Sequence, residues 1–355
     1  MSAVALQRPL QWTARALAFG AVAFALGWVL FFAQDTNFGP LVEDPRSFLI
    51  TLLNGLTFAG LLFIVASGFS LIFGLMRVVN MAHGSFYLIG GYLAYEIQQE
   101  MTGAGGFAIS GADVSSWEWV LPAIVACACI AALGLLIQQV FLRWNQGQDL
   151  RQALITVAIS VIIADQVIAH FNEGIASSVT WPGWTNRLVD LGLYDVQYSL
   201  TRLVVLALGV LIGLALYLWL YRTRTGMVIR AGVDDQQMTS ALGVNIQVTF
   251  AIAFVVGSAL AAFGGVVGAS QGAAASGQDG QWLLNSLVVV IIGGMGSLVG
   301  AVAGSLLYGL VFSFSAVYLP TTSDNCCTQY SIVFTFVLLA LVLAFRPQGL
   351  FGRAG

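Results

Sequence analysis

Charge is scarce in this sequence, and lysine is absent. Only 8% of the 355 residues are charged, and all 13 basic residues are arginine. An ordinary soluble domain has about 25% charged residues, so we expect most of this chain to lie in lipid. A phosphate-binding P-loop requires a lysine, so the sequence excludes ATP hydrolysis by that route. The chain has no basic patch, which excludes nucleic-acid binding.

Histidine and cysteine are also rare, which limits metal and catalytic sites. The histidines are His83 and His170, and the cysteines are Cys127, Cys129, Cys326 and Cys327. Zinc would need further ligands at suitable spacing beside either cysteine pair. No nucleophile or paired carboxylate accompanies His83. We therefore expect a non-catalytic protein with no metal site and no cofactor.

Long apolar runs, in contrast, recur from end to end. A helix needs about 20 apolar residues to cross the hydrocarbon core, and most of the runs reach that length. The runs at 84–97 and 282–294 are short, so each is a half-helix or continues through its neighbour. The sequence predicts an all-α integral membrane protein, one polytopic domain over residues 1–355, with about 8–10 transmembrane or half-spanning helices and glycine-rich breaks. The runs are 16–33, 48–74, 84–97, 119–142, 153–171, 200–221, 248–270, 282–294, 297–318 and 329–345.

The arginines indicate how the chain is oriented. With a cytoplasmic N-terminus and ten alternating segments, most arginines fall inside, as the positive-inside rule requires. Both termini are then cytoplasmic, and the long loops with most of the acidic residues form the outer face. The inside arginines are Arg8, Arg15, Arg77, Arg143, Arg151, Arg222, Arg224, Arg230, Arg346 and Arg353, and the outside ones are Arg46, Arg187 and Arg202.

The polar segment 222–247 lies on the arginine-rich side, between two apolar runs. We expect a surface helix that begins at Thr225 as its N-cap and ends at Gly243 in the left-handed conformation. Its apolar side would carry Met227, Ala231, Met238 and Leu242. Such a helix suits a groove on a soluble motor protein. A solvated connecting loop, or a helix resting on lipid headgroups, is the alternative.

Glycines cluster near the C-terminal end. Gly296, Gly300 and Gly304 have the four-residue spacing that places small residues on one helix face, which favours close helix packing. Gly293 and Gly294 precede them and are expected to break a helix at membrane depth. Such a break is tolerated only where the backbone faces protein or water, so it would mark a transport pathway.

Asn80 and His83 mark another expected break, at the cytoplasmic end beside Arg77. They could form a gate or contact an ATPase, or they could fix the turn through hydrogen bonds. Asp165 and Gln166 lie inside an apolar run, where a carboxylate is costly and suggests a site facing a cavity. Asp165 could meet the solute, or it could pair with Gln138 or Gln139 across the bundle.

Several motifs occur together and in order. The early motifs are Asn54-Gly55-Leu56, the glycine-bounded stretch from Gly68 to Leu75, and Asn80-Met81-Ala82-His83-Gly84. The loop motif is Gly226, Arg230-Ala231, Asp234 or Asp235, Ala241 and Gly243-Val244-Asn245. The late motifs are the glycine-rich stretch 288–304 and the tail Phe345-Arg346-Pro347-Gln348-Gly349-Leu350-Phe351-Gly352. In this combination the chain resembles the branched-chain amino acid permease family, the Liv-type membrane subunits of ABC importers.

The resemblance implies a bacterial inner-membrane importer. Its partners would be a second permease subunit in a heterodimer, two ATPase subunits that contact the loop motif, and a periplasmic solute-binding protein. Branched-chain or other amino acids are the implied cargo, while relatives with similar motifs carry urea, amides or small organic acids. An ion-coupled secondary transporter is an alternative, but it would ordinarily carry several intramembrane ionisable residues. A channel is a further alternative.

Overall fold

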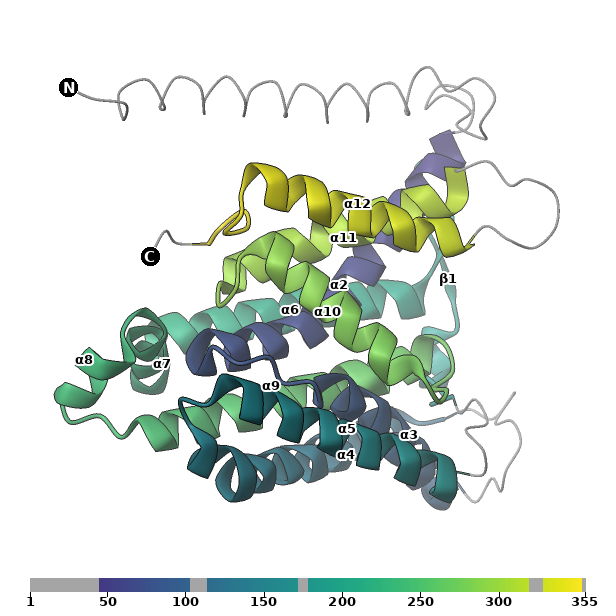
Figure 1. Cartoon of the computed structure of the whole chain (residues 1–355). Coiled ribbons are helices and arrows are strands. Elements are labelled where there is room, and N and C mark those ends of the chain that lie inside the picture. The colour runs from purple at the N-terminus through teal and green to yellow at the C-terminus, as the bar shows by residue number, and fades with distance from the viewer. Residues whose placement is uncertain (1–44, 103–113, 172–177, 319–327, 353–355) are drawn as a thin grey trace, which may run out of the picture.

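The computed structural model describes residues 45–102, 114–171, 178–318 and 328–352. Within these ranges nearly every apolar run is a helix (Figure 1). The helices are α2 (Pro45–Met76), α3 (His83–Thr102), α4 (Ser116–Ile137), α5 (Asp149–His170), α6 (Leu200–Arg222), α9 (Ile246–Gln271), α10 (Gln278–Gly293), α11 (Leu298–Tyr318) and α12 (Thr328–Phe345). The expected run at 16–33 lies outside the described residues.

Six of the described helices are long and apolar enough to cross a membrane: α2, α4, α5, α6, α9 and α11. The run at 84–97 extends into the 20-residue helix α3, whereas α10 has only 16 residues. The predicted multi-pass membrane protein is confirmed in this respect, and the described residues are mostly helical rather than all-α, because they include a two-stranded sheet. The sharp breaks lie between α2 and α3 and between α10 and α11.

The helices form layers around α2 (Figure 1). One side of α2 packs on α11 and α10, with α12 beyond them, and the other side packs on α6 and α9. Helices α3 and α4 lie against α9 on the far side. Small residues allow these contacts: a Cβ on Gly90 would lie 2.6 Å from the Cα of Ala262. Close approach through small residues is how helices associate in lipid, where hydrophobic burial provides little driving force.

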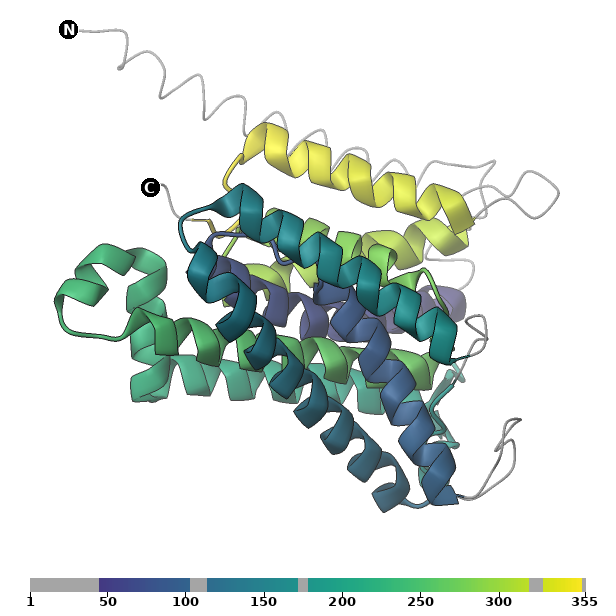
Figure 2. The same cartoon turned by 60° about the horizontal axis from the view of Figure 1, so that its bottom comes forward.

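Short elements cap the two ends of the bundle. One end carries an antiparallel hairpin of β1 (Leu188–Asp190) and β2 (Gln197–Ser199). The opposite end carries α7 (Arg224–Asp234) and α8 (Gln236–Ala241), which project beyond the other helices in both views (Figures 1 and 2). Helix α4 continues through a π-helical turn, Gln138–Leu142, and a 3-10 turn, Arg143–Asn145, toward α5. The bundle therefore has two chemically different ends.

The early Asn-Gly motif holds the hairpin end together. Asn54 accepts hydrogen bonds from the Tyr198 hydroxyl, at 3.0 Å, and from the Arg202 guanidinium. Gly55 packs on α11, where a Cβ would lie 3.2 Å from the carbonyl oxygen of Gly309. The motif thus joins α2 to the hairpin and to α11.

Candidate functional site

The projecting segment between α6 and α9 consists of two helices, not the single helix expected. Thr223 caps α7, since its hydroxyl oxygen accepts a hydrogen bond from the Gly226 N–H at 3.1 Å, so the expected cap at Thr225 is wrong. The chain then bends at Asp235, which is extended and caps α8 by accepting from the Met238 N–H at 3.0 Å. Gly243 has φ +84°, as the sequence predicts.

The inner face of this segment belongs to the core. Ile229 is buried and packs in one cluster with Leu75 of α2, Leu220 of α6 and Phe250 of α9. Gly226 fits against the end of α6 because it has no side chain: a Cβ there would lie 2.4 Å from the Trp219 carbonyl oxygen. This region of the fold is therefore anchored to three membrane helices at once.

The outer face of the segment is exposed and mixes apolar with polar side chains. Met227, Met238 and Leu242 are 51%, 61% and 77% exposed, and Ala231 and Ala241 are exposed beside them. Asp234 and Asp235 are also exposed. Arg230 is half-buried, with its guanidinium 4.3 Å from the centre of the Tyr221 ring. The loop residues named by the sequence thus divide into an anchored set, Gly226 and Arg230, and an outward set.

Two contacts tie the segment to its neighbours. The Gln236 amide donates a hydrogen bond to the Leu75 carbonyl at the end of α2. On the other flank, the amides of Gln146 and Gln247 exchange two hydrogen bonds, which join the α4–α5 connection to the start of α9. A displacement of α8 would therefore act directly on the end of α2.

After the first break, residues 77–82, the chain turns back toward the middle of α2. The His83 Nε2 is 3.0 Å from the carbonyl oxygen of Val65, which precedes the end of α2 by eleven residues. At 1.5 Å per residue this is about 16 Å along the α2 axis. The His83 side chain thus reaches into the bundle, because the chain turns back after Met76.

Side chains hold the first break in place. The Asn80 Oδ1 accepts from the Ala82 N–H, and the Thr156 hydroxyl of α5 accepts from the Met81 N–H, both at 3.1 Å. His83 is fully buried, with its ring edge-on to Phe69. Asn80 thus fixes the turn through a hydrogen bond, which is one of the two roles considered from the sequence. Its Nδ2 and the His83 Nδ1 are nevertheless buried without a hydrogen-bond partner.

The second break, residues 294–297, is closed by protein. Helix α10 ends at Gly293, and Gly294 and Gly296 have φ +104° and +79°. The carbonyl oxygens of Ile292 and Gly293 accept hydrogen bonds, both 2.9 Å, from the Leu350 and Phe351 N–H groups. The tail motif therefore covers the break, so the expectation that Gly293 and Gly294 mark a pathway is not supported by these contacts.

The spaced glycines serve two different interfaces. A Cβ on Gly300 would lie 2.3 Å from the carbonyl oxygen of Gly293, and one on Gly304 would lie 2.2 Å from that of Val289. Both therefore pack on α10, as the spacing predicts. Gly296 precedes α11 and lies against Gly74 of α2, where a Cβ would be 2.9 Å from the Cα, so the three do not share one helix face.

Asp165 and Gln166 lie on the exposed face of α5. The expected pairing of Asp165 across the bundle is wrong. Gln138 is fully buried and its amide has no partner, and the Gln139 Oε1 accepts from Arg143 at 3.3 Å. The carboxylate points away from the described core because α5 turns Ile163 and Val167 inward instead.

Four glutamines are further candidate site residues that the sequence did not single out. Gln146, Gln152, Gln236 and Gln247 gather at the end of the bundle that carries α8. The available signal was their position, at or beside the ends of long apolar runs, where each amide must find a partner.

Known proteins resemble this chain over most of its length. The family described as the branched-chain amino acid transport system, permease component, matches residues 51–343. The high-affinity branched-chain amino acid permease protein LivH of Salmonella typhimurium is 30% identical over 316 residues, 88% of this chain and 97% of its own. BraD of Pseudomonas aeruginosa, with the same description, is 29% identical over 86% of this chain and 96% of its own.

Among solved structures, PsaBC from Streptococcus pneumoniae in complex with Fab matches with a TM-score of 0.45 and 9% identity, covering 85% of this chain and 94% of that one. The match to the permease family spans far more than half of the sequence. The chain therefore belongs to the branched-chain amino acid transport permease family, and it is a non-catalytic, multi-pass plasma-membrane subunit of an ABC transporter.

Proposed function

We propose that this permease imports branched-chain or other amino acids and is driven by two partner ATPases that bind α7 and α8. One observation carries the proposal: α7 and α8 project from the bundle, expose Met227, Met238 and Leu242, and remain anchored to α2, α6 and α9. A solvated loop would not need exposed apolar side chains on a segment joined to a rigid core. A helix that docks in a groove of a partner protein needs both features.

The end that carries α7 and α8 is proposed to be cytoplasmic, together with both termini of a single domain over residues 1–355. The arginines support this orientation. Arg222, Arg224 and Arg230 lie in or beside α7, whereas Arg187 and Arg202 lie beside the hairpin at the other end. The positive-inside rule then assigns the hairpin end to the periplasm, where a solute-binding protein would dock.

A second permease subunit is proposed to cover the exposed face of α5. Asp165 and Gln166 lie within that face, among exposed apolar side chains such as Val161 and Ile162. A carboxylate facing hydrocarbon is costly, so polar residues at this depth face protein or a water-filled path. Asp165 and Gln166 are therefore the proposed pathway residues, at the contact between the two subunits of a heterodimer.

The cargo follows from the relatives. LivH and BraD are described as branched-chain amino acid permeases, which supports an amino acid as the solute. Urea, an amide or a small organic acid in the same class of importer is the alternative. The solute that co-purifies with the binding protein of this system separates these cases. A secondary transporter is disfavoured because Asp165 alone is a clear ionisable residue within a described span.

The docking proposal is tested with Leu242→Glu in the full-length permease. A charge placed in a desolvated apolar interface should weaken ATPase binding at least tenfold, about 1.4 kcal/mol, measured by pull-down from detergent or nanodiscs. Leu193→Glu is the matched control, because Leu193 is also exposed, at 56%, but lies at the hairpin end. Equal ATPase binding by both variants would contradict the assignment of α7 and α8.

A further inference from the structure

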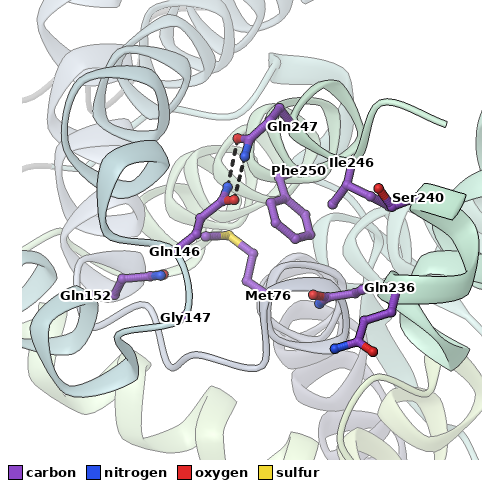
Figure 3. Close-up of a pocket in the computed structure, with 10 residues that line it drawn as sticks. Met76, Gln146, Gly147, Gln152, Gln236, Ser240, Ile246, Gln247 and Phe250 are labelled. Atoms are coloured by element: carbon purple, nitrogen blue, oxygen red, sulfur yellow. Dashed lines mark hydrogen bonds between the residues drawn. The ribbon is translucent and has the colours of Figure 1, made fainter. Parts of the chain in front are cut away.

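A pocket of about 520 Å³ opens beside α8, at the proposed cytoplasmic end (Figure 3). Its walls come from the end of α2, the α4–α5 connection, the start of α5, α8 and the start of α9. The lining residues are Met76, Gln146, Gly147, Gln152, Gln236, Gln237, Ser240, Ile246, Gln247 and Phe250. Five of these ten are glutamines and none is ionisable. The pocket therefore offers amide donors and acceptors without charge.

One amide oxygen in the wall of this pocket lacks a hydrogen-bond partner. Gln152 is 3% exposed, and its Nε2 donates to the Asn145 carbonyl oxygen at 2.8 Å. Its Oε1 accepts no hydrogen bond. A buried acceptor without a donor costs about 1–3 kcal/mol, so it calls for an explanation. By contrast, Gln146 and Gln247 satisfy each other at the pocket edge (Figure 3).

A second cavity continues inward from the pocket. It measures about 10 Å³, and Met76 and Gln152 line both spaces. Asn80 lines the inner cavity, is 3% exposed, and has an Nδ2 without a partner. The inner cavity is about the size of one water molecule. Where the two spaces adjoin, the protein thus buries one unmet acceptor, on Gln152, and one unmet donor, on Asn80, and neither atom is open to the pocket.

We propose that this pocket is a binding site for a small neutral solute of the carboxamide class. A carboxamide in the pocket can donate to the Gln152 Oε1 once this side chain turns toward the pocket, which gives the unmet acceptor a partner. Its apolar part would rest on Met76, Ile246 and Phe250. An anion or cation is disfavoured, because burying a charge without an opposite charge is expensive. The volume lies within the range of about 300–1,000 Å³ usual for small-molecule sites.

Occupation of the site would hold α8 in place. Gln236, Gln237 and Ser240 of α8 form one wall, while the α4–α5 connection and α9 form the others. A ligand that binds this arrangement stabilises it over any in which α8 moves away. The solute would therefore slow ATPase coupling from the cytoplasmic side, a role that rests on the proposed function. Binding itself does not rest on it.

The test uses full-length permease in nanodiscs with its four native cysteines replaced by serine. Ser240→Cys is labelled with a maleimide in the presence of isovaleramide, isovalerate or isoamylamine at millimolar concentration. We expect isovaleramide to slow labelling at least threefold, and the anion and the cation to have no effect. Because no ATPase is present, a failed result here is independent of the docking test with Leu242→Glu.

Two controls make the result decisive. Met227→Cys, on the exposed face of α7 and outside the pocket, should label at the same rate with or without isovaleramide. Gln152→Leu added to Ser240→Cys should abolish the protection. No slowing by isovaleramide, equal slowing by isovalerate, or protection that survives Gln152→Leu would each overturn the proposal. If the cysteine variants do not fold, melting temperatures replace the labelling. They are measured on the protein with its native cysteines and on its Gln152→Leu variant. Isovaleramide should raise the melting temperature only of the protein that keeps Gln152.

Discussion

The two breaks in this bundle are held by different kinds of contact. The second break is closed by backbone: the Leu350 and Phe351 N–H groups bond the end of α10, and Gly294 and Gly296 take the positive-φ positions. The first break is held by side chains from Asn80 itself and Thr156 of α5, and Gln236 of α8 bonds the adjoining end of α2. Backbone closure makes a fixed joint. Side-chain closure leaves a joint that neighbouring helices can adjust.

The polar atoms of the two breaks differ in the same way. At the first break, the Asn80 Nδ2 and the Gln152 Oε1 are buried next to a water-sized cavity and lack partners. At the second break, the terminal carbonyl oxygens of α10 are paired with the tail. Irregular backbone at membrane depth is tolerated where it is covered by protein or lines a hydrated space, and the two breaks illustrate these two cases. We therefore expect substitutions at the second break to affect stability, and those at the first to affect transport.

The largest expected effect is at the second break. Gly300→Leu would drive a side chain into the Gly293 carbonyl oxygen and separate α11 from α10. We expect a loss of about 4 kcal/mol in unfolding free energy, seen as a collapse of melting temperature or of membrane yield. Gly280→Ala, in the same helix pair but with open space around the Cβ, should be neutral or stabilising. A stable Gly300→Leu protein would show that the second break is not a tight joint.

The next largest effect comes from removal of residues 349–355. This deletion takes away the N–H groups that pair with Ile292 and Gly293, so two carbonyl oxygens lose their partners. We expect a loss of about 2–3 kcal/mol, measured by denaturant or thermal unfolding in detergent. Deletion of residues 353–355 alone keeps both pairs and serves as the control. Equal stability of the two truncated proteins would mean that the tail does not close the break.

A smaller effect is expected for Thr156→Val at the first break. The substitution keeps the side-chain shape but leaves the Met81 N–H without its acceptor, at a cost of about 1–2 kcal/mol. Thr156→Ser keeps the hydroxyl and should retain most of the stability. If the first break is adjustable, transport should fall more steeply than stability in Thr156→Val. Full transport at reduced stability would argue that this break is only structural.

The smallest effect is expected for Arg77→Gly. Arg77 has φ +54° and an exposed side chain. Glycine there relieves backbone strain in the folded state but raises the conformational entropy of the unfolded chain. These effects oppose each other, and we expect a change below about 1 kcal/mol. Gly294→Ala, at φ +104° and against the tail, should cost several times more by the same unfolding assay. Similar values for the two positions would remove the contrast between the breaks.

The sequence predicts the helices well, because apolar runs of membrane length leave the backbone no other way to satisfy its hydrogen bonds. Gly243 as a left-handed stop and the packing of Gly300 and Gly304 were also predictable from local rules. Long-range pairings were not. Nothing in the run of residues says that Leu350 bonds Ile292, or that His83 lies level with Val65.

The projecting segment between α6 and α9 also shows which features local sequence predicts and which depend on distant contacts. Its location and exposed apolar face follow from the sequence. The bend at Asp235 does not follow from the sequence, because an aspartate is compatible both with an exposed position in a helix and with the N-cap of a new helix. Asp165 was misjudged in its pairing for a related reason: periodicity identifies an amphipathic face but cannot say which neighbour covers it.

Partner ATPases are proposed to drive this permease through α7 and α8. Leucine uptake into proteoliposomes that contain the permease, its ATPases and its binding protein tests it most directly. ATP is supplied on the cytoplasmic side while ionophores collapse all ion gradients. We expect ATP-dependent uptake that persists without gradients and is lost in Leu242→Glu. Uptake that survives ATP depletion but disappears with the gradient would contradict it.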